Sequence, residues 1–199
     1  MTLRIIGKAS SINVRKVLWT CDEIGLPHER RDEGPELARN PNGLVPVIVD
    51  GEFVLWESHT ILRYLVGRDG STELLPHEPR RRAEVEQWID WQATDLNSSW
   101  RYAFMALVRR DPAFDDPRQI AASTANWNRM MSILDARLAT TQAFVAGADF
   151  TLADIPIGLS VNRWLMTPLE RPVFPEVLAY YERLSARAAF LKHGRNGIA

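Results

Sequence analysis

The chain has 199 residues, a formal net charge of −1 and an apolar fraction of 46%. This length fits one large domain or two small ones, and the near-neutral charge argues against a nucleic-acid-binding protein, which needs a basic excess. No apolar run approaches the roughly 18 residues of a membrane span, and the first residues enter a strand-like segment without a signal-peptide pattern. The single cysteine excludes an internal disulfide framework, so we expect a cytoplasmic globular protein.

The first elements expected along the chain are a strand at 3–7 and a helix from about Asn13. Apolar residues recur in this helix at helical spacing, and they are Val14, Val17, Leu18, Cys21 and Ile24. Gly25 stands where a left-handed C-terminal cap belongs, and Pro27 prevents the helix from continuing. Cys21 falls on the apolar face, which favours a core residue over a nucleophile.

Two short segments lead into a hairpin. A polar strand is expected at 28–31, as at a sheet edge, and the segment 33–39 is too brief for a full helix. A turn of Asn, Pro and Gly at 40–43 precedes two apolar runs, at 47–49 and 53–55, with an Asp-Gly pair between them. Asp-Gly between two such runs is a strong hairpin signal.

Pro46 and the Glu57-Ser58 pair flank this hairpin. The missing N–H of Pro46 suits only an edge strand or a strand start, and the bond before it is a candidate for the cis form. Ser58 is expected to be the N-cap of a second helix, whose pattern residues are Ile61, Leu62, Tyr64 and Leu65. A helix N-terminus after a strand carries free N–H groups and is suited to bind a carboxylate or phosphate.

Asn-Pro-x-Gly-x-Val-Pro from 40 to 46, the hairpin and Glu-Ser before a helix together resemble the glutathione-binding half of bacterial, serine-type cytosolic glutathione S-transferases. The resemblance implies an α/β plus all-α architecture, with an N-terminal thioredoxin-like domain followed by a C-terminal helical bundle domain. It implies that the backbone of Val45, before a cis Pro46, pairs with the cysteinyl unit of glutathione. Glu57 and Ser58 would hold the amine and the α-carboxylate of the γ-glutamyl group.

The composition then changes to Gly, Ser, Pro and charged residues at 68–80, which we interpret as a linker. The linker separates a thioredoxin-like glutathione-binding domain at 1–67 from an all-helical domain at 81–199. The helices expected in the second domain are 81–109, 120–139 and 175–190.

Thr151 and Asp154 have the spacing of a capping box at the start of a further helix, with Thr151 as N-cap and Asp in place of the commoner Glu. Members of the transferase family carry a Thr-x-Ala-Asp box at the start of a buried helix, where it is a folding element. Pro156 would lie one turn inside this helix, and we expect a local distortion there.

The resemblance places the catalytic group in the loop between the first strand and the first helix. Glutathione's thiol is a weak nucleophile at neutral pH because the thiolate is the reactive species, and a hydroxyl donor near a helix N-terminus favours the anion. Ser11, with basic residues four and five positions later, fits the serine-type pattern, and Asn13 fits a Thr-x-Asn pattern of other bacterial members as a second donor. Two alternatives stay open: Ser10 contacts the sulfur, or these polar residues only cap the helix.

The second substrate is expected to meet the long helix of the second domain, and the candidates are Trp91, Trp100, Arg101 and Phe104. Plain packing is the alternative for Trp88 and Trp100. Leu44 stands where relatives often carry a polar or basic residue, and the 32–39 segment is short, so we expect a weaker grip on the glycyl carboxylate. Arg39 and Lys8 are both open as substitutes.

We therefore interpret the sequence as an enzyme, a glutathione transferase that activates the thiolate for attack on an electrophilic, apolar substrate. The alternatives are a glutathione-dependent disulfide reductase and a non-catalytic binding or scaffold module of the same fold. Glutathione serves as co-substrate, and the four histidines show no metal-ligand spacing, so no metal is expected. The family resemblance implies a homodimer and gives no indication of a nucleic-acid or membrane partner.

Overall fold

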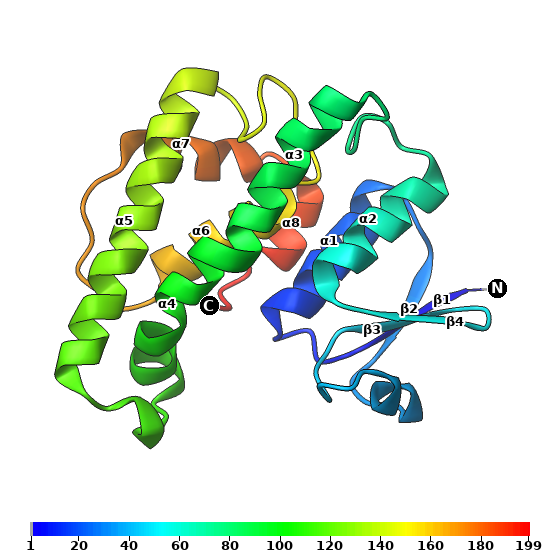
Figure 1. The fold of residues 1–199 in the computed structure, drawn as a ribbon, viewed down its shortest axis with the longest axis horizontal. Helices are drawn as coiled ribbons and strands as arrows, with labels where there is room; N and C mark the ends of the chain where they lie inside the picture. The colour runs from blue at the N-terminus through cyan, green and yellow to red at the C-terminus, as the bar shows by residue number, and fades with distance from the viewer. Residues whose placement is uncertain (1) are drawn as a thin grey trace.

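Residues 2–199 are described by the structure, a computed structural model, in which a small sheet with its helices lies beside a larger group of helices (Figure 1). The strands are β1 (Leu3–Ile6), β2 (His28–Arg31), β3 (Val47–Asp50) and β4 (Phe53–Trp56), in the order β2-β1-β3-β4. β1 pairs parallel with β2 and antiparallel with β3, and β3 pairs antiparallel with β4. The predicted thioredoxin-like domain is confirmed.

Burial explains the sequence of each strand. β1 and β3 are central and mostly buried, so both are mainly apolar on both faces, with Arg4 and Asp50 as the half-buried exceptions. β2 is an edge strand with mostly exposed side chains, as its polar sequence predicted. The hairpin is confirmed, but Asp50 pairs with Phe53, which leaves Gly51 and Glu52 as its turn.

The helices of this first part are α1 (Ile12–Glu23) and α2 (Ser58–Asp69), which pack against each other on the side of the sheet facing the helical part (Figure 1). A short 3-10 turn, η1 (Pro35–Arg39), occupies the segment that is too brief for an α-helix. Asp50 fastens the hairpin to α2, because its carboxylate accepts a 2.7 Å hydrogen bond from the Tyr64 hydroxyl.

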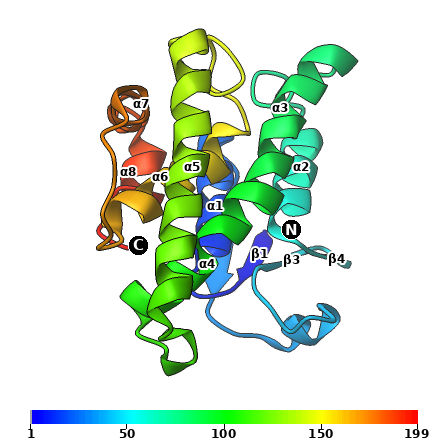
Figure 2. The same ribbon diagram turned by 60° about the vertical axis from the view of Figure 1, so that its left-hand side comes forward.

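A long helical rod begins the second part. It consists of α3 (Pro79–Trp91) and α4 (Asn97–Phe104), joined and extended by two π-helical turns, Gln92–Leu96 and Met105–Arg109. The long helix α5 (Pro117–Thr141) packs against α4. In the view of Figure 2, α7 and α8 are seen to one side of α5, and α3 and α2 to the other.

The remaining helices are α6 (Asp154–Met166), α7 (Pro175–Leu184) and α8 (Ala188–His193). The prediction of one helix at 175–190 is wrong, because the chain leaves the helical conformation at Arg187, with φ −94° and ψ 123°. There the Arg187 guanidinium pairs with Glu23 of α1, Nε to Oε1 at 2.9 Å. A tertiary ion pair therefore accompanies the break between α7 and α8.

The prediction of a local helix distortion at Pro156 is also wrong. The helix α6 begins at Asp154 rather than directly after Thr151, so Pro156 lies in the first turn, where a backbone N–H has no intrahelical partner to lose. The Asp154 carboxylate does reach back to the Thr151 N–H at 2.8 Å, which is half of a capping box. It also accepts hydrogen bonds from the Val145 N–H and the Tyr180 hydroxyl, so its role is to hold the fold.

The two parts share one hydrophobic core across α1, α6 and α8. Trp19 of α1 is fully buried, with its ring centroid 5.0 Å from that of Phe190 and 6.1 Å from that of Phe150. Between α2 and α3 the connection spans 70–78, shorter than the predicted linker because both helices extend into it. No helix within residues 2–199 is long and apolar enough to cross a membrane.

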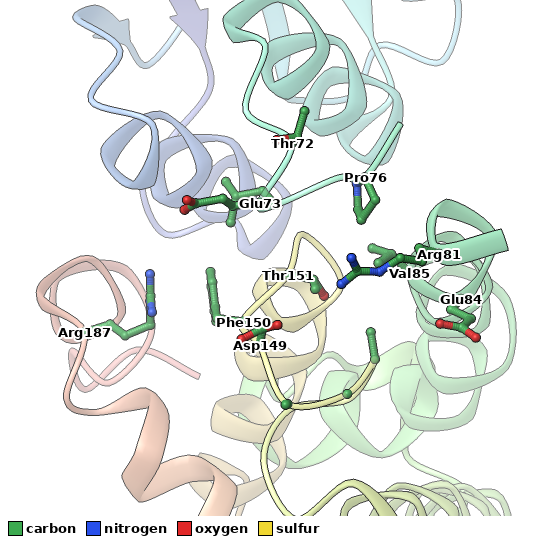
Figure 3. A pocket seen from close by; sticks show the side chains of 14 residues that line it. Thr72, Glu73, Pro76, Arg81, Glu84, Val85, Asp149, Phe150, Thr151 and Arg187 are labelled. Atoms are coloured by element: carbon green, nitrogen blue, oxygen red, sulfur yellow. The ribbon is translucent and has the colours of Figure 1, made fainter. Parts of the chain in front are cut away.

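A cavity of about 650 Å³ lies between this connection, α3, the loop before α6 and the start of α8 (Figure 3). Its wall combines Arg81 and Arg187 with Glu73, Glu84 and Asp149, so charges of both signs face it. None of the site residues predicted from the sequence lines it. The predicted chemistry belongs to another part of the molecule.

Candidate active site

A smaller cavity, of about 70 Å³, lies where the hairpin, α1 and α2 meet. Its lining residues are Asn13, Asn40, Asn42, Leu44, Val45, Pro46, Trp56, Glu57 and Ser58. They come from three separate segments of the chain, 13, 40–46 and 56–58, and five of them were predicted as glutathione-site residues. The peptide bond between Val45 and Pro46 is cis, as the sequence suggested.

Gly7 allows the chain to pass close to Val45 at the end of β1. It has a positive φ of 144°, and a Cβ there would lie 2.8 Å from the Cβ of Val45 and 2.5 Å from a methyl carbon of Val14. Real Cβ atoms are not found at such distances, so only glycine fits without a shift. The position of Val45 therefore depends on the absence of a side chain at Gly7.

Asn40 organises the loop on the other side of Val45. Its side chain is 6% exposed, its Nδ2 donates to the Leu44 carbonyl at 2.7 Å, and its Oδ1 accepts from the Asn42 N–H at 3.0 Å. The sequence predicted only a turn here and missed Asn40 and Asn42 as cavity residues. The signal was the two asparagines, whose side chains commonly bond to the local backbone in turns. Leu44, 66% exposed, lies at the rim.

Glu57, not Ser58, is the N-cap of α2, so that prediction is wrong by one residue. Glu57 has a positive φ of 75°, uncommon for a non-glycine residue, and its carboxylate accepts from the His59 N–H at 3.3 Å. Ser58 is buried, and its hydroxyl lies 3.5 Å from Glu57 Oε1. The pair thus joins an exposed carboxylate to a hydroxyl and a helix N-terminus, which suits a ligand carrying both an amine and a carboxylate.

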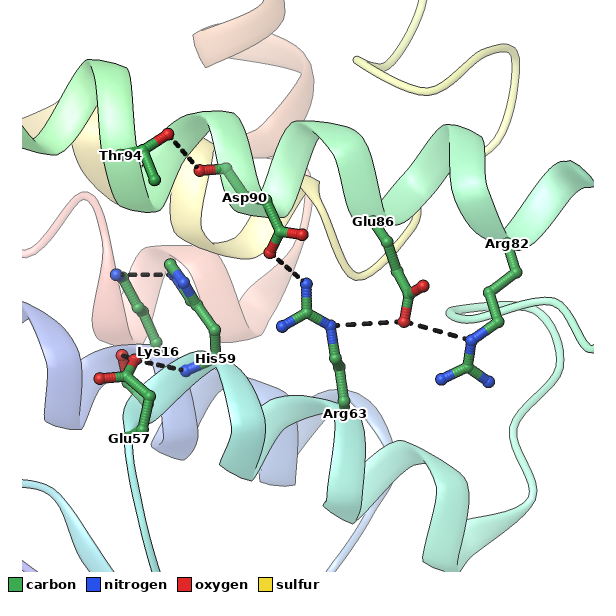
Figure 4. Close-up of polar contacts among 9 residues, drawn as sticks. Lys16, Glu57, His59, Arg63, Arg82, Glu86, Asp90 and Thr94 are labelled. Atoms are coloured by element: carbon green, nitrogen blue, oxygen red, sulfur yellow. Dashed lines mark hydrogen bonds and ion pairs between the residues drawn. The ribbon is translucent and has the colours of Figure 1, made fainter. Parts of the chain in front are cut away.

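A buried polar chain begins at His59, directly after this pair (Figure 4). Lys16 Nζ lies 3.0 Å from His59 Nε2 and donates to Gln92 Oε1 at 3.1 Å. Burial lowers the pKa of Lys16 to about 7 and that of His59 to about 2, so His59 is neutral and its Nε2 accepts from Lys16. Gln92 continues the chain to Ser160 Oγ at 3.0 Å. The network joins α1, α2, the first π turn and α6, and no local sequence signal pointed to it.

Further along the same surface, ion pairs connect α2 to α3 (Figure 4). Arg63 contacts Asp90 through NH2 at 2.5 Å and Glu86 through Nε at 3.4 Å. Glu86 also pairs with Arg82. These contacts fix α2, and with it Ser58, against the helical part.

Ser11 is the N-cap of α1 in extended conformation, and its side chain makes no capping hydrogen bond in the described structure. The Ser11 hydroxyl therefore does not cap the helix, which was the alternative role for it. Ser11 is half-buried and Ser10 exposed, and neither lines the small cavity, whereas Asn13, half a turn away, does. Cys21 is fully buried, and burial raises the pKa of its thiol to about 12, as expected for a core residue.

Of the four predicted second-substrate residues, two are buried side by side and two are not part of that pair. Trp100 and Phe104 are 8% and 4% exposed and stack edge to face at 5.4 Å. The guanidinium of Arg163 covers both, 4.6 Å from the Trp100 ring and 4.1 Å from the Phe104 ring. Trp91 stacks instead on Trp88. The fourth candidate, Arg101, is exposed.

Among residues 2–199, no three His, Cys, Asp or Glu side chains are grouped to hold a metal ion.

Comparison with protein families gives two matches in chain order. Residues 10–67 match the family model described as "Glutathione S-transferase, N-terminal domain", and residues 100–188 match "Glutathione S-transferase, C-terminal domain". Glutathione S-transferase GstB of Escherichia coli K12 is 37% identical over 197 residues, which cover 94% of each chain. Disulfide-bond oxidoreductase YfcG of the same organism is 30% identical over 169 residues, covering 78% of this chain and 74% of YfcG.

A solved structure extends this similarity to the whole fold. The theta class glutathione S-transferase of the citrus canker pathogen Xanthomonas axonopodis pv. citri, with glutathione bound, superposes with a TM-score of 0.91 at 33% identity. The match covers 100% of this chain and 99% of that one.

Proposed function

Because this chain belongs to the glutathione S-transferase family and is a glutathione transferase, we propose that it binds glutathione along Val45 and directs the sulfur to Ser11 for attack on an electrophile. The single observation that carries the proposal is the small cavity, in which the cis Val45-Pro46 bond, Glu57 and Ser58 meet the first turn of α1. The relatives are named as enzymes, which sets aside the binding-module alternative.

Each end of the tripeptide has a partner in this arrangement. The backbone N–H and C=O of Val45 pair with the cysteinyl unit, since a strand start next to a proline leaves main-chain groups open to a ligand. The γ-glutamyl carboxylate sits on the Ser58 hydroxyl and the N-terminus of α2, and Glu57 accepts from the amine. The glycyl carboxylate is left for Asn42, which lines the cavity, and Lys8 and Arg39 both stay open as its basic partner.

The proposed chemistry is stabilisation of a thiolate. Lowering a thiol pKa by about two units requires roughly 2.7 kcal/mol. A hydrogen bond from the Ser11 hydroxyl to the sulfur anion supplies about 1.5–3 kcal/mol, and the N-terminus of α1 about 0.3–1 kcal/mol. Asn13 is a second donor. The thiolate attacks an electrophilic carbon, a C–S bond forms, and the leaving group departs with its electron pair.

A second activity is favoured by the similarity to YfcG, whose name describes a disulfide-bond oxidoreductase. In that reaction the same thiolate attacks a disulfide sulfur, the S–S bond breaks, and the released thiolate takes a proton. The thiolate of a second glutathione then attacks the glutathione sulfur of the mixed disulfide, the remaining S–S bond to the substrate breaks, and oxidised glutathione and the second substrate thiolate, which takes a proton, are released. Turnover of a hydroxyalkyl disulfide, compared with that of a nitroaryl chloride, distinguishes the two activities.

We also propose that the protein is a cytoplasmic homodimer, with the first domain of one subunit against the helices of the other. Phe53, 47% exposed on the edge strand β4, is an apolar side chain that such an interface would cover. Sedimentation velocity should give twice the mass of one chain, and a monomer at micromolar concentration would contradict this part.

The test of the proposed function is retention on immobilised glutathione followed by conjugation of a nitroaryl chloride. A crystal soaked with glutathione should then place the sulfur within 3.5 Å or so of the Ser11 hydroxyl, a hydrogen-bond distance to sulfur. A sulfur atom out of reach of every donor between Ser10 and Asn13 would overturn the catalytic role of this loop.

A further inference from the structure

Three arginines converge beside the predicted second-substrate residues, and we call Arg15, Arg109 and Arg163 the arginine cluster. Arg15 belongs to α1, Arg109 ends the second π turn, and Arg163 belongs to α6. None of the three forms an ion pair with a carboxylate within residues 2–199. Burial, followed by repulsion within the cluster, lowers the pKa of Arg15 to about 10 and that of Arg163 to about 9.

Two members of the cluster face the ring of Phe104. The Arg163 guanidinium lies 4.1 Å from the centre of its ring, and the Arg109 guanidinium lies 5.5 Å from it. Arg15 connects the cluster to the catalytic loop, because its backbone N–H donates to the Ser11 carbonyl at 2.9 Å in the first turn of α1. Arg15 thus shares the first turn of α1 with Ser11, while Arg109 and Arg163 face Phe104, a predicted second-substrate residue.

The inner part of the cluster is buried with no Asp or Glu side chain of the described residues paired to it. Arg15 and Arg163 are 1% and 3% exposed, and the Nε atoms of both have no hydrogen-bond partner. Their other guanidinium contacts go to the carbonyls of His193, Ile198 and Ala199, at 3.0–3.5 Å. A buried cation is costly unless an anion is near, and an α-carboxylate at position 199 would offset one charge of three.

We propose that the arginine cluster selects electrophiles that carry a carboxylate on an apolar body. Arg109 is exposed and can contact the carboxylate directly, since its planar guanidinium matches both carboxylate oxygens. Arg163, which faces the Phe104 ring, and Arg15, which lies close enough to Arg163 to repel it, add positive potential. This inference rests on the proposed transferase function and names the class of its second substrate.

The test compares 4-chloro-3-nitrobenzoate with 4-chloro-3-nitrobenzamide. In both, the glutathione thiolate attacks the carbon that bears chlorine, the C–S bond forms, and chloride leaves with the C–Cl electron pair. The two compounds differ in the charge of one group that takes no part in bond making. Because that group also alters ring reactivity, each enzymatic kcat/KM is divided by the uncatalysed rate constant with glutathione.

The corrected kcat/KM should be about tenfold higher for the benzoate than for the benzamide, and R109Q should remove this preference while R109K retains most of it. R110Q is the matched control, since Arg110 is the neighbouring exposed arginine and lies outside the cluster. R110Q should keep the preference. Equal corrected values for the two substrates, or an equal loss in R109Q and R110Q, would overturn the proposal.

A binding measurement separates failure of this inference from failure of the transferase function. The two S-aryl glutathione products are titrated calorimetrically into wild type and R109Q. Tighter binding of the carboxylate product by wild type alone supports the cluster. Equal binding of both products overturns the inference but leaves the transferase function intact, whereas no binding of either overturns both. A weaker affinity of R109Q for glutathione itself would assign the cluster to the tripeptide, against the proposal.

Discussion

Ser11 is the residue on which the proposed chemistry depends. Its hydroxyl makes no capping bond, so it is available to the sulfur. S11A should raise the pKa of bound glutathione by about two units and lower kcat/KM near pH 6.5 by about 100-fold, since each pKa unit changes the thiolate fraction about tenfold. The pH dependence of kcat/KM with a nitroaryl chloride measures both.

S10A is the matched control for this prediction, since Ser10 is the preceding, exposed serine. It should leave the pH profile unchanged. The reverse result, with a shifted profile in S10A and a normal one in S11A, would transfer the role to Ser10.

Lys16 gives a prediction about pH and stability. Its pKa is near 7 in the folded protein and near 10.5 unfolded, so between these values the unfolded state binds the extra proton. Stability from this group therefore rises as the pH increases from about 7 to 10.5, and its burial penalty is complete below pH 7. K16M removes the titration, so wild type should gain stability relative to K16M between pH 7 and 9. Urea unfolding at pH 7 and pH 9 measures the free energy of unfolding of wild type and K16M. A wild-type minus K16M difference that is the same at both pH values would contradict the prediction.

At the scale of elements, the end of β1 is a tightly constrained junction. G7A should be destabilised by about 1–3 kcal/mol because its Cβ collides with Val45 and its φ is unfavourable for alanine. Displacement of Val45 should also weaken glutathione binding. Urea unfolding and glutathione titration measure the two effects.

The matched control is Gly67, which lies in α2 with open space around it. G67A should stabilise the protein by about 0.5–1 kcal/mol, as alanine does in a helix. A G7A protein as stable as G67A, with unchanged glutathione affinity, would show that the junction tolerates a side chain.

Elements that depend on local signals could be predicted from the sequence. The Asp-Gly hairpin, the edge strand β2 and the glycine after α1, with φ 64°, all have the predicted form. The errors in predicted helix boundaries arise where a residue distant in the sequence determines where the helix begins or ends. Arg187 leaves its helix beside Glu23, 164 residues away, and the start of α6 depends on contacts of Asp154 with Tyr180 as well as Thr151.

The candidate site shows the same division. Val45, Pro46, Glu57 and Ser58 follow from short motifs, and the structure gathers them with Asn13. Asn40 acts through a turn that the sequence predicts, but its place in the cavity depends on contacts outside that turn. The Lys16–His59–Gln92 chain and the arginine cluster join residues from three or more elements, and no periodicity or spacing in one segment indicates such contacts.

At the scale of the whole molecule, Trp19 joins the two parts. W19A should cost about 3–5 kcal/mol, as expected for truncation of a fully buried aromatic side chain. Because its ring packs on Phe150 and Phe190, both parts should lose stability together and unfold in one transition. Far-UV circular dichroism during urea unfolding measures this. L178A, at a site 41% exposed, should cost roughly 1 kcal/mol or less. Two separate transitions in W19A would show that the parts are stabilised independently.

The helix α1 begins after Ser11, carries Lys16 near its middle and ends with Trp19 and Glu23 in its last two turns. These last two turns are held by α6, by α8 and by the Arg187 guanidinium. The group proposed to face the sulfur is therefore built on a rod whose other end is embedded in the opposite half of the protein. A hinge opening about the 70–78 connection would break the packing of α1 against α6 and α8. We therefore expect substrates to enter by small movements of the residues at the rim of the small cavity. A gene fragment encoding the first half alone should accordingly yield an insoluble product.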